Sequence, residues 1–316
     1  MGGGEGQRPG ESTRALIVGY GSIGRRHGEV LDSLRCDTAV LSRRVDAVVD
    51  RPAFGTLEEA LAEHHPTYIV VADETSRHAE TICALTQCGY DGRVLVEKPL
   101  FAQPSAVPEN AFAALGVGYN LRFHPAVQAL RQALDRDTAL TVQASVGQYL
   151  PDWRPGVDYR LSYSADRERG GGVLRDLSHE LDLLVWLFGG PSEVVAMGGR
   201  VSSLEIKSDD AWSALLRQPR SAMTSVHLDY LHHPGRRLLS ITTEDRSLDL
   251  DLIAGTLTVN GDVNRFSVER NFSIRAMHAA MLTTGRDVCD ASTAVTVMRT
   301  IAAIEESAVC RGWVEP

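Results

Sequence analysis

Three glycines near the N-terminus constrain the fold of this 316-residue chain more than any other feature. They lie in the segment ALIVGYGSIGRRH, between an apolar run that predicts a buried strand and a stretch that predicts a helix. Gly19 would permit the tight turn, Gly21 would let the backbone approach a pyrophosphate, and Gly24 would let the helix pack against the sheet. The helix N-terminus would offer free N–H groups to phosphate. The pattern predicts dinucleotide binding at Gly19, Gly21, Ser22, Ile23 and Gly24; a simple glycine turn is the alternative.

Short apolar runs alternate with helical stretches through the first third of the chain, the order typical of βαβ units on a parallel sheet. We expect strands at residues 15–18, 38–42, 68–72, 93–96 and 116–118. We expect helices at residues 23–34, 57–64, 76–87 and 106–115. This order predicts a Rossmann domain over residues 13–120, preceded by a disordered tail at residues 1–12.

The pattern changes after residue 120. Helices are expected at 124–136, 174–188 and 291–310, with a loop at 150–172. Strands are expected at 139–149, 193–202, 211–217, 221–230, 237–243, 247–252 and 255–259. The predicted fold class is α/β: a Rossmann domain, then an α+β domain over residues 121–316 with a large open, mainly antiparallel sheet. Helices on one side of that sheet would leave its other face uncovered, so we expect a homodimer or homotetramer.

The second strand ends where a dinucleotide fold usually places an acidic residue against the ribose 2′-hydroxyl. Here the position falls in Ser42, Arg43 and Arg44. A carboxylate would repel a 2′-phosphate, whereas a hydroxyl and a guanidinium would bind one. We therefore favour NADP(H), with NAD(H) possible. The alternative is that both arginines are solvated loop charges.

Composition limits the remaining choices. The net charge of −9 disfavours a nucleic-acid partner, and no apolar run is long enough to span a membrane. The five cysteines have neither disulfide-framework nor zinc-site spacing, so no metal is predicted. We expect a cytoplasmic protein. Basic residues number 32, yet only Lys98 and Lys207 are lysines.

Lys98 lies in VLVEKPL, residues 94–100, where the chain resembles the glucose-fructose oxidoreductase, inositol dehydrogenase and MocA (Gfo/Idh/MocA) family. VGYGSIGRRH, ADETSRHAE, GYNLRFHP and GGGVLRDLSHELDLLVWLFG follow the family order and cover nearly the whole chain. The resemblance implies that Lys98 reaches both nicotinamide and substrate and that Pro99 takes the cis form. We expect Glu97 to orient Lys98 and to contribute to the cofactor site. An ammonium beside a reacting carbonyl stabilises alkoxide charge.

The other shared segments supply further candidates. The resemblance implies that Thr75, His78 and Asn120 contact the cofactor and that Arg122 contacts the substrate. Asp73 and Glu74 stand where the family more often has a small residue and a proline. Thr75 is alternatively the N-cap of the next helix.

Asp176 and His179 are the acid–base candidates. Three residues apart on one helix, they would share a face, and Asp182 lies three further along. Many family members space this pair by four, which leaves open which of the two touches the substrate. His179 is the better proton acceptor because its ordinary pKa lies near neutrality. The alternative is a packed structural histidine.

The segment GQYLPDWRPGVDYRLSYSA resembles a branch of the family associated with sugar and surface-polysaccharide biosynthesis. Aromatic faces pack on sugar rings, and arginines bind phosphate or carboxylate, so the segment suits an anionic or nucleotide-linked sugar. The substrate candidates here are Tyr149, Trp153, Arg154, Tyr159 and Tyr163. A packed loop or an interface is the alternative.

These features predict an NAD(P)-dependent dehydrogenase or reductase that moves a hydride to or from a CH–OH carbon of a sugar, cyclitol or nucleotide-linked sugar. Lys98, Asp176 and His179 would handle the proton. Two alternatives stay open: a reductase of imines or conjugated double bonds, and a dinucleotide-binding sensor without hydride chemistry. A sensor has no need of a proton-transfer set.

Overall fold

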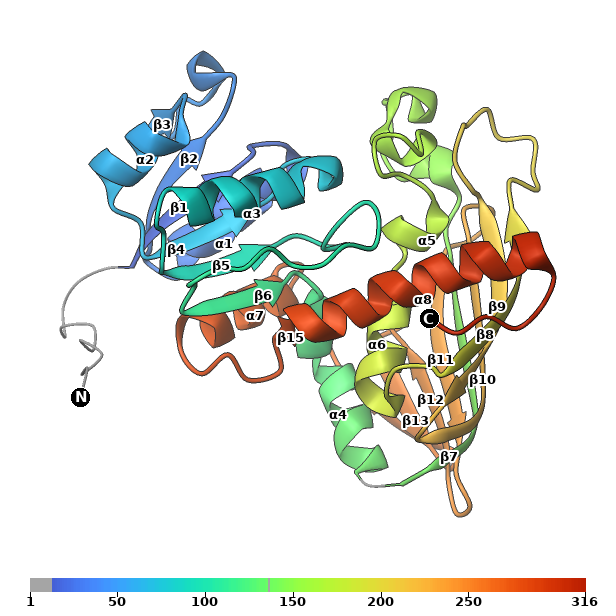
Figure 1. The fold of residues 1–316 in the computed structure, drawn as a ribbon. Coiled ribbons are helices and arrows are strands. Elements are labelled where there is room, and N and C mark those ends of the chain that lie inside the picture. The colour runs from blue at the N-terminus through green and yellow to red at the C-terminus, as the bar shows by residue number, and fades with distance from the viewer. Residues whose placement is uncertain (1–12, 136) are drawn as a thin grey trace.

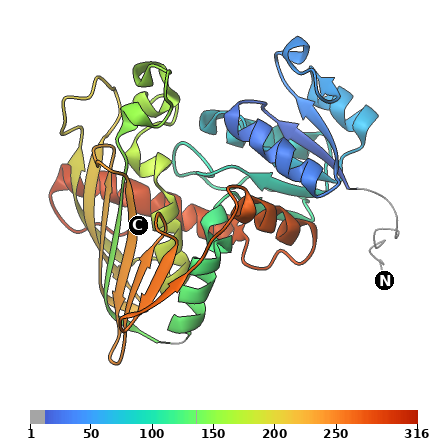
Figure 2. The same cartoon turned by 180° about the vertical axis from the view of Figure 1, so that it is seen from behind.

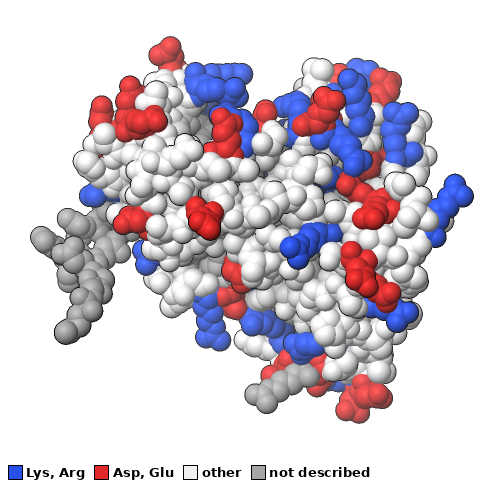
Figure 3. Space-filling view, in the orientation of Figure 1, with Lys and Arg blue, Asp and Glu red and all other residues white. Residues whose placement is uncertain are grey.

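The computed structural model describes residues 13–135 and 137–316, which form two lobes (Figure 1). The expected tail at residues 1–12 lies outside the described residues. Seen from behind, the lobes meet through the helix and loop segments at the centre of the view (Figure 2). Figure 3 shows acidic and basic side chains interspersed over one face of the molecule, with a hollow between the lobes.

The first lobe is a seven-stranded sheet of order β15-β6-β5-β4-β1-β2-β3. Its strands are β1 (Arg14–Val18), β2 (Asp37–Leu41), β3 (Ala53–Phe54), β4 (Tyr68–Val71), β5 (Arg93–Val96), β6 (Ala114–Val117) and β15 (Cys289–Asp290). The first six pair in parallel. After the arginines that begin β1 and β5, the strands β1, β4 and β5 are continuous apolar runs, because helices cover both faces of such a sheet. Helices α1 (Ser22–Ser33), α2 (Leu57–His64) and α3 (His78–Gln87) connect them. The predicted Rossmann fold is confirmed.

The helix predicted at 106–115 is wrong. No helix forms there, and β6 begins at Ala114. Pro108 lacks the N–H that a helix interior needs and disfavours helix before it. Asn110 then closes a local turn: its Nδ2 donates to the carbonyl of Pro108, and its Oδ1 accepts from the N–H of Phe112.

The second lobe is an eight-stranded sheet of order β14-β13-β12-β11-β7-β10-β9-β8. β7 and β10 are parallel neighbours, and every other pair is antiparallel. The bounds are β7 Ala139–Gly147, β8 Glu193–Gly199, β9 Ala211–Gln218, β10 Ser221–Asp229, β11 Arg236–Thr242, β12 Ser247–Asp251, β13 Thr256–Val259 and β14 Asp262–Arg265. The large, mainly antiparallel sheet confirms the predicted fold class; β14 was not expected.

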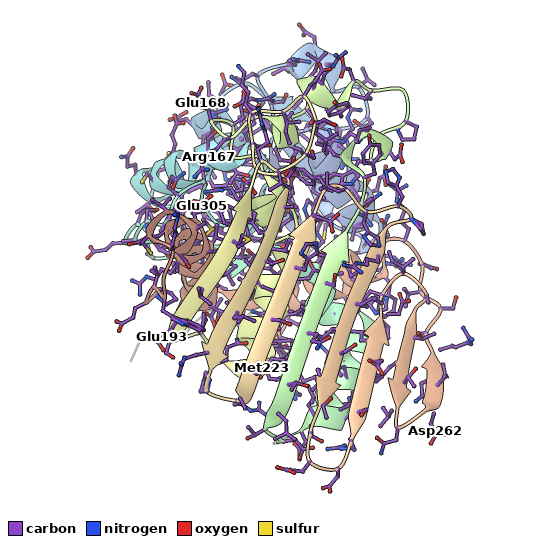
Figure 4. The ribbon with its side chains drawn as sticks, turned by 90° about the vertical axis from the view of Figure 1, so that its right-hand side faces the viewer. Arg167, Glu168, Glu193, Met223, Asp262 and Glu305 are labelled. Carbon is purple, nitrogen blue, oxygen red and sulfur yellow. The ribbon has the colours of Figure 1, made fainter. Side chains whose placement is uncertain are left out.

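Helices cover one face of this sheet: α4 (Pro125–Leu134), α6 (His179–Phe188) and α8 (Ala291–Cys310). Figure 4 looks onto the other face, which none of the described helices covers. Apolar side chains are exposed on that face, with Met223 at 53% and Met197 at 81%. Within the described ranges, no helix is both long and apolar enough to cross a bilayer.

The helix predicted over 174–188 is broken in two. A short α5 (Val173–Asp176) ends before α6 begins at His179. At the break, the Ser178 hydroxyl donates to the carbonyl of Arg175 (2.9 Å) and accepts from the Tyr119 hydroxyl (3.3 Å). A serine that bonds to nearby backbone competes with regular helix. The assumption that Asp176 and His179 share one helical face is therefore wrong.

One helix was missed entirely. α7 (Phe272–Leu282) follows the second sheet but packs on the first lobe, where it buries Ile274, Met277 and Met281 in the core that contains β1 and β4 residues. β15 then pairs antiparallel with β6 as an edge of the first sheet. The chain thus returns to the first lobe before α8 crosses to the second.

Candidate active site

The glycine turn after β1 has the geometry that a pyrophosphate needs. Gly19 has φ +89°, and a Cβ there would lie 2.7 Å from the backbone of Asp73. A Cβ on Gly24 would lie 2.1 Å from the carbonyl oxygen of Gly19, whereas one on Gly21 would meet nothing within 4 Å. The first turn of α1 has no side-chain cap and no acidic residue, so the N–H groups that begin at Ser22 and Ile23 remain open to an anion. These residues fit a dinucleotide.

The arginines after β2 are exposed. Among the described residues, neither Arg43 nor Arg44 has an ion-pair partner, and the Ser42 hydroxyl accepts the N–H of Arg44 (3.1 Å). Tyr20, between the glycines, donates to Asp50 (2.8 Å), and Asp50 in turn pairs with Arg51. Within the described part of the chain, the guanidinium groups of Arg43 and Arg44 are therefore unpaired cations at this end of the sheet.

The lysine turn after β5 joins the two lobes. The Lys98–Pro99 bond is cis, as the resemblance implied. Lys98 Nζ donates to the backbone carbonyl of Asp176 (2.7 Å), and the Lys98 N–H donates to Glu97 Oε2 (3.1 Å). Burial alone would raise the pKa of Glu97, but the hydrogen bond with His27 and the charge of Lys98 hold it below the ordinary value. A carboxylate thus supports the turn that carries the amine.

His78 and Thr75 differ in their surroundings. His78 is buried, with Nδ1 3.1 Å from the carbonyl oxygen of Leu100 and Nε2 3.4 Å from that of Asp73. Both nitrogens face protein oxygen atoms, so His78 braces the lysine turn instead of presenting a free nitrogen to a cofactor. Thr75 begins the short turn η2 (Thr75–Arg77), and the N-cap of α3 is Arg77, so the alternative that Thr75 caps this helix is wrong. A Cβ on Gly170 would lie 3.3 Å from Thr75 Cβ, so the two lobes meet at this loop.

Asp176 and His179 have distinct environments. Asp176 is 7% exposed, and its Oδ2 accepts the Tyr230 hydroxyl (2.6 Å). Burial and the neighbouring Asp176 carboxylate raise the pKa of Tyr163. Two tyrosines therefore surround this carboxylate, while the backbone of Asp176 holds Lys98.

His179 is partly exposed, and its ring lies edge-on to that of Tyr119, with 5.6 Å between the ring centroids. Its Nδ1 is buried and has no hydrogen-bond partner among the described residues. Burial, followed by the charges of Lys98 and Arg237, lowers the pKa of His179 well below its ordinary value. His179 is therefore neutral at pH 7 and able to accept a proton.

Arg122 is 2% exposed, and one edge of its guanidinium, formed by Nε and Nη2, is bonded to protein. Nε and Nη2 donate to the two carboxylate oxygens of Asp182 at 2.9 and 2.6 Å, and the group lies over Trp186. This pair joins the turn η3 (Asn120–Phe123) to α6. The guanidinium expected to contact substrate is occupied by Asp182. Asn120 is partly exposed at the end of β6, beside the lysine turn, where its N–H donates to Gly118.

The aromatic loop contains three short turns: η4 (Leu150–Asp152), η5 (Tyr159–Leu161) and η6 (Tyr163–Ala165). Trp153 packs edge-on against Tyr230 at 5.2 Å, and Arg154 lies over Tyr163 at 6.0 Å. The loop therefore packs around the tyrosines that surround Asp176. Its outer members pair elsewhere, Tyr149 with His233 (4.0 Å) and Tyr159 with the N–H of Glu205 (3.2 Å).

Sequence reasoning missed Tyr230 and His27. Tyr230 follows β10 in the segment VHLDYLHH, which contains no motif to mark it. His27 lies in the segment GRRH, which begins at the third glycine, Gly24. A polar ring on the buried face of an otherwise amphipathic helix was the available signal.

Two family models match this chain. One is described as an oxidoreductase family with an NAD-binding Rossmann fold and covers residues 13–118; the other is the GFO/IDH/MocA C-terminal domain and covers residues 127–249. The chain belongs to the Gfo/Idh/MocA oxidoreductase family. The resemblance carried by the ordered motifs is confirmed, and the first lobe is the NAD-binding Rossmann domain of this family.

Family relatives with established names are distant. Trans-1,2-dihydrobenzene-1,2-diol dehydrogenase of Sus scrofa is 29% identical over 53% of this chain and 50% of its own length, so the match spans about half of that relative. UDP-N-acetylglucosamine 3-dehydrogenase of Acidithiobacillus ferrooxidans is 27% identical over 78% of this chain and 76% of its own. The WlbA dehydrogenase of Bordetella pertussis, solved with NADH and UDP-GlcNAcA, has the same fold, with TM-score 0.80, 18% identity, and coverage of 97% of this chain and 98% of its own.

Proposed function

We propose that this family member is a dehydrogenase or reductase that transfers a hydride between a nicotinamide and a secondary alcohol or ketone carbon of a sugar, cyclitol or nucleotide-linked sugar. One observation carries the proposal: Lys98, from the cofactor lobe, is bonded at 2.7 Å to the backbone of Asp176, and its charge lowers the pKa of the neighbouring His179. A titratable amine and a neutral imidazole thus lie beside each other where the lobes meet. Two curated relatives named as dehydrogenases support the same reaction class.

The contacts of His179, Lys98 and Asp176 indicate a different role for each residue in the reaction. In oxidation, neutral His179 takes the hydroxyl proton, while the carbon-bound hydrogen leaves as hydride; bound nicotinamide supplies the hydride acceptor. The Lys98 ammonium stabilises the developing alkoxide. Asp176 acts mainly through its carbonyl, which orients Lys98, and through the tyrosines that its carboxylate holds. Reduction runs through the same groups in reverse.

The preferred cofactor is NADP(H), with NAD(H) also bound. Arg43 and Arg44 are exposed cations with no ion-pair partner among the described residues, and the Ser42 hydroxyl lies beside them. A 2′-phosphate would gain charge-assisted hydrogen bonds there, and no carboxylate occupies that position of the strand end to repel it.

The substrate is sugar-like and carries an anionic or nucleotide group. Trp153 and Tyr163 offer aromatic faces near Asp176, and Arg154 is an exposed cation in the same loop. The named substrate of the relative from Acidithiobacillus ferrooxidans is a nucleotide sugar.

The uncovered face of the second sheet favours a homodimer or homotetramer, and the five free cysteines favour a reducing, cytoplasmic location.

The test is a turnover screen of nucleotide sugars and keto-sugars with oxidised or reduced cofactor, repeated with Lys98→Met. The loss of a positioned charge-stabilising group should lower kcat by two or more orders of magnitude while cofactor affinity, measured by calorimetry, stays within about threefold. Lys207→Met is the matched control because Lys207 is the other lysine of the chain and its side chain is exposed. Full turnover by Lys98→Met would refute the proposed mechanism, and cofactor binding without turnover of any substrate would favour the sensor.

A further inference from the structure

Four polar side chains, of which Glu97 is 13% exposed and the other three are fully buried, form a continuous hydrogen-bonded chain beneath the lysine turn. The Tyr68 hydroxyl on β4 lies 2.8 Å from Nδ1 of His278 on α7. His278 Nε2 lies 2.8 Å from Nδ1 of His27 on α1, and His27 Nε2 lies 2.9 Å from Oε1 of Glu97. Tyr68, His27 and His278 are all 0% exposed. We call these four residues the buried histidine chain.

The direction of the hydrogen bonds follows from the residues at the ends of the buried histidine chain. Burial, above all, raises the pKa of Tyr68 well above its ordinary value, so its hydroxyl keeps its proton. Among the described residues, the only hydrogen-bond partner of that hydroxyl is Nδ1 of His278, which must therefore accept. Burial also lowers the pKa of His278 well below its ordinary value, so this ring is neutral and carries its proton on Nε2.

The directions of the remaining hydrogen bonds in the buried histidine chain are then determined. His278 Nε2–H donates to His27 Nδ1, so His27 also carries its proton on Nε2 and donates it to the Glu97 carboxylate. The reverse direction would place protons on both Nδ1 atoms and leave the buried Tyr68 hydroxyl without an acceptor. An unpaired buried donor is costly, so only the direction from Tyr68 to Glu97 pairs every group.

We propose that His27, held in this tautomer by His278 and Tyr68, is a positioning residue that keeps Glu97 ionised and so aims Lys98. The inference rests on the proposed function of Lys98. Glu97 Oε1 faces His27, while Oε2 accepts the Lys98 N–H at 3.1 Å. A protonated Glu97 would lose the charge that favours the Lys98 ammonium and would weaken the bond that holds the turn.

Other groups act on Glu97 as well, and none replaces His27. The charges of Lys98 and of Arg26, on α1, also favour the carboxylate, but Arg26 directs its guanidinium to Asn271 and to the carbonyl of Arg270. His27 is therefore the side chain that donates directly to Glu97. Loss of a hydrogen bond to a charged group should raise the pKa of Glu97 by about one unit.

The kinetic test compares two His27 variants. His27→Phe keeps the ring volume and removes the donor, so the acid limb of the kcat profile that reports Glu97, as distinct from the limb that reports His179, should move about one unit to higher pH. His27→Gln offers an N–H at the position of Nε2 and should keep the limb near that of the unmodified enzyme. His64→Phe is the matched control, because the carbonyls of Ala15 and Asp37 are the only partners of buried His64 among the described residues; it should lower stability without moving the limb. An unmoved limb in His27→Phe, or an equal displacement in His27→Gln, would overturn the proposal.

A second measurement does not depend on turnover or on a folded variant. Nitrogen-15 NMR of histidine-labelled, unmodified protein without substrate should show His27 and His278 both protonated on Nε2 and both neutral at pH 7. Protonation of either ring on Nδ1, or an imidazolium at His27, would refute the direction of the chain. Because this spectrum reports tautomers alone, it separates failure of the histidine chain from failure of the proposed reaction.

Discussion

Replacement of Arg122 by methionine separates a structural role from the substrate contact expected from the sequence. The guanidinium makes two hydrogen bonds, of 2.6 and 2.9 Å, to Asp182, and the two side chains are 3% and 1% exposed. Methionine keeps an apolar stem of similar length and removes the cation. Asp182 is then buried without its charged partner, which is the costly way to break an ion pair.

The size of the effect depends on pH, because the abandoned carboxyl can take up a proton. Burial raises the pKa of Asp182 even beside Arg122, and removal of Arg122 raises it further. If Asp182 is protonated in the folded variant, its protonation costs about 1.4 kcal/mol of folding free energy for each unit by which the pH exceeds the unfolded pKa of about 3.9. The loss of folding stability in Arg122→Met is therefore at most about 4 kcal/mol at pH 7 and about 1.5 kcal/mol at pH 5. An unfolding entropy of about 2.1 cal/mol/K per residue gives a loss in Tm of about 6 °C at pH 7 and about 2 °C at pH 5.

Differential scanning fluorimetry at both pH values, together with steady-state kinetics below the transition, tests this reasoning. The double variant Arg122→Met with Asp182→Leu should recover most of the lost Tm, since an apolar pair replaces the ionic one. Arg160→Met is the control, because the ion pair between Arg160 and Asp158 is exposed, and its loss should leave Tm nearly unchanged. An Arg122→Met enzyme with unchanged Tm and a raised KM for substrate would restore the substrate-contact hypothesis.

Three further outcomes are expected. Arg43→Ala should weaken NADP(H) binding by about 1–3 kcal/mol and leave NAD(H) binding unchanged; calorimetry with equal losses for both would contradict the cofactor preference. His179→Asn should slow turnover and remove the His179 limb from the kcat/KM profile for alcohol oxidation. In the unmodified enzyme, that limb lies well below pH 6.5, because the lowered pKa keeps the ring neutral until the solution is more acidic. Met223→Lys, on the uncovered sheet face, should reduce self-association in light scattering, whereas a monomeric unmodified protein at micromolar concentration would argue against an interface there.

The elements that the sequence predicted well are those with local signals. β1 and α1 follow from an apolar run, three glycines and an amphipathic stretch, all within about 20 residues of each other. The cis bond before Pro99 and the convergence of Lys98 with the segment of Asp176 followed from ordered family motifs. Each of these features depends on neighbours in sequence or on a motif that is itself contiguous.

The features that were missed depend on distant partners. The apolar face of α7 packs on the core of the first lobe, whose strands β1 to β6 lie more than 100 residues earlier in the sequence. The role of His278 depends on its hydrogen bonds to Tyr68 and His27. The break at Ser178 reflects a hydroxyl that also bonds to Tyr119, from the other lobe. Arg122 looked available because its partner, Asp182, stood in a helix whose orientation the sequence does not specify.

The return of the chain to the first sheet bears on how this protein is synthesised. When residues 1–120 have left the ribosome, every strand of the first sheet except β15 has been made, yet neither that edge strand nor α7 exists. The apolar surface that Ile274, Met277 and Met281 later cover is then open to water, and the Tyr68 hydroxyl and His27 lack the ring between them. Completion of the cofactor lobe therefore waits for nearly the full chain, and an excised nucleotide-binding half would need residues 272–290 supplied through a linker.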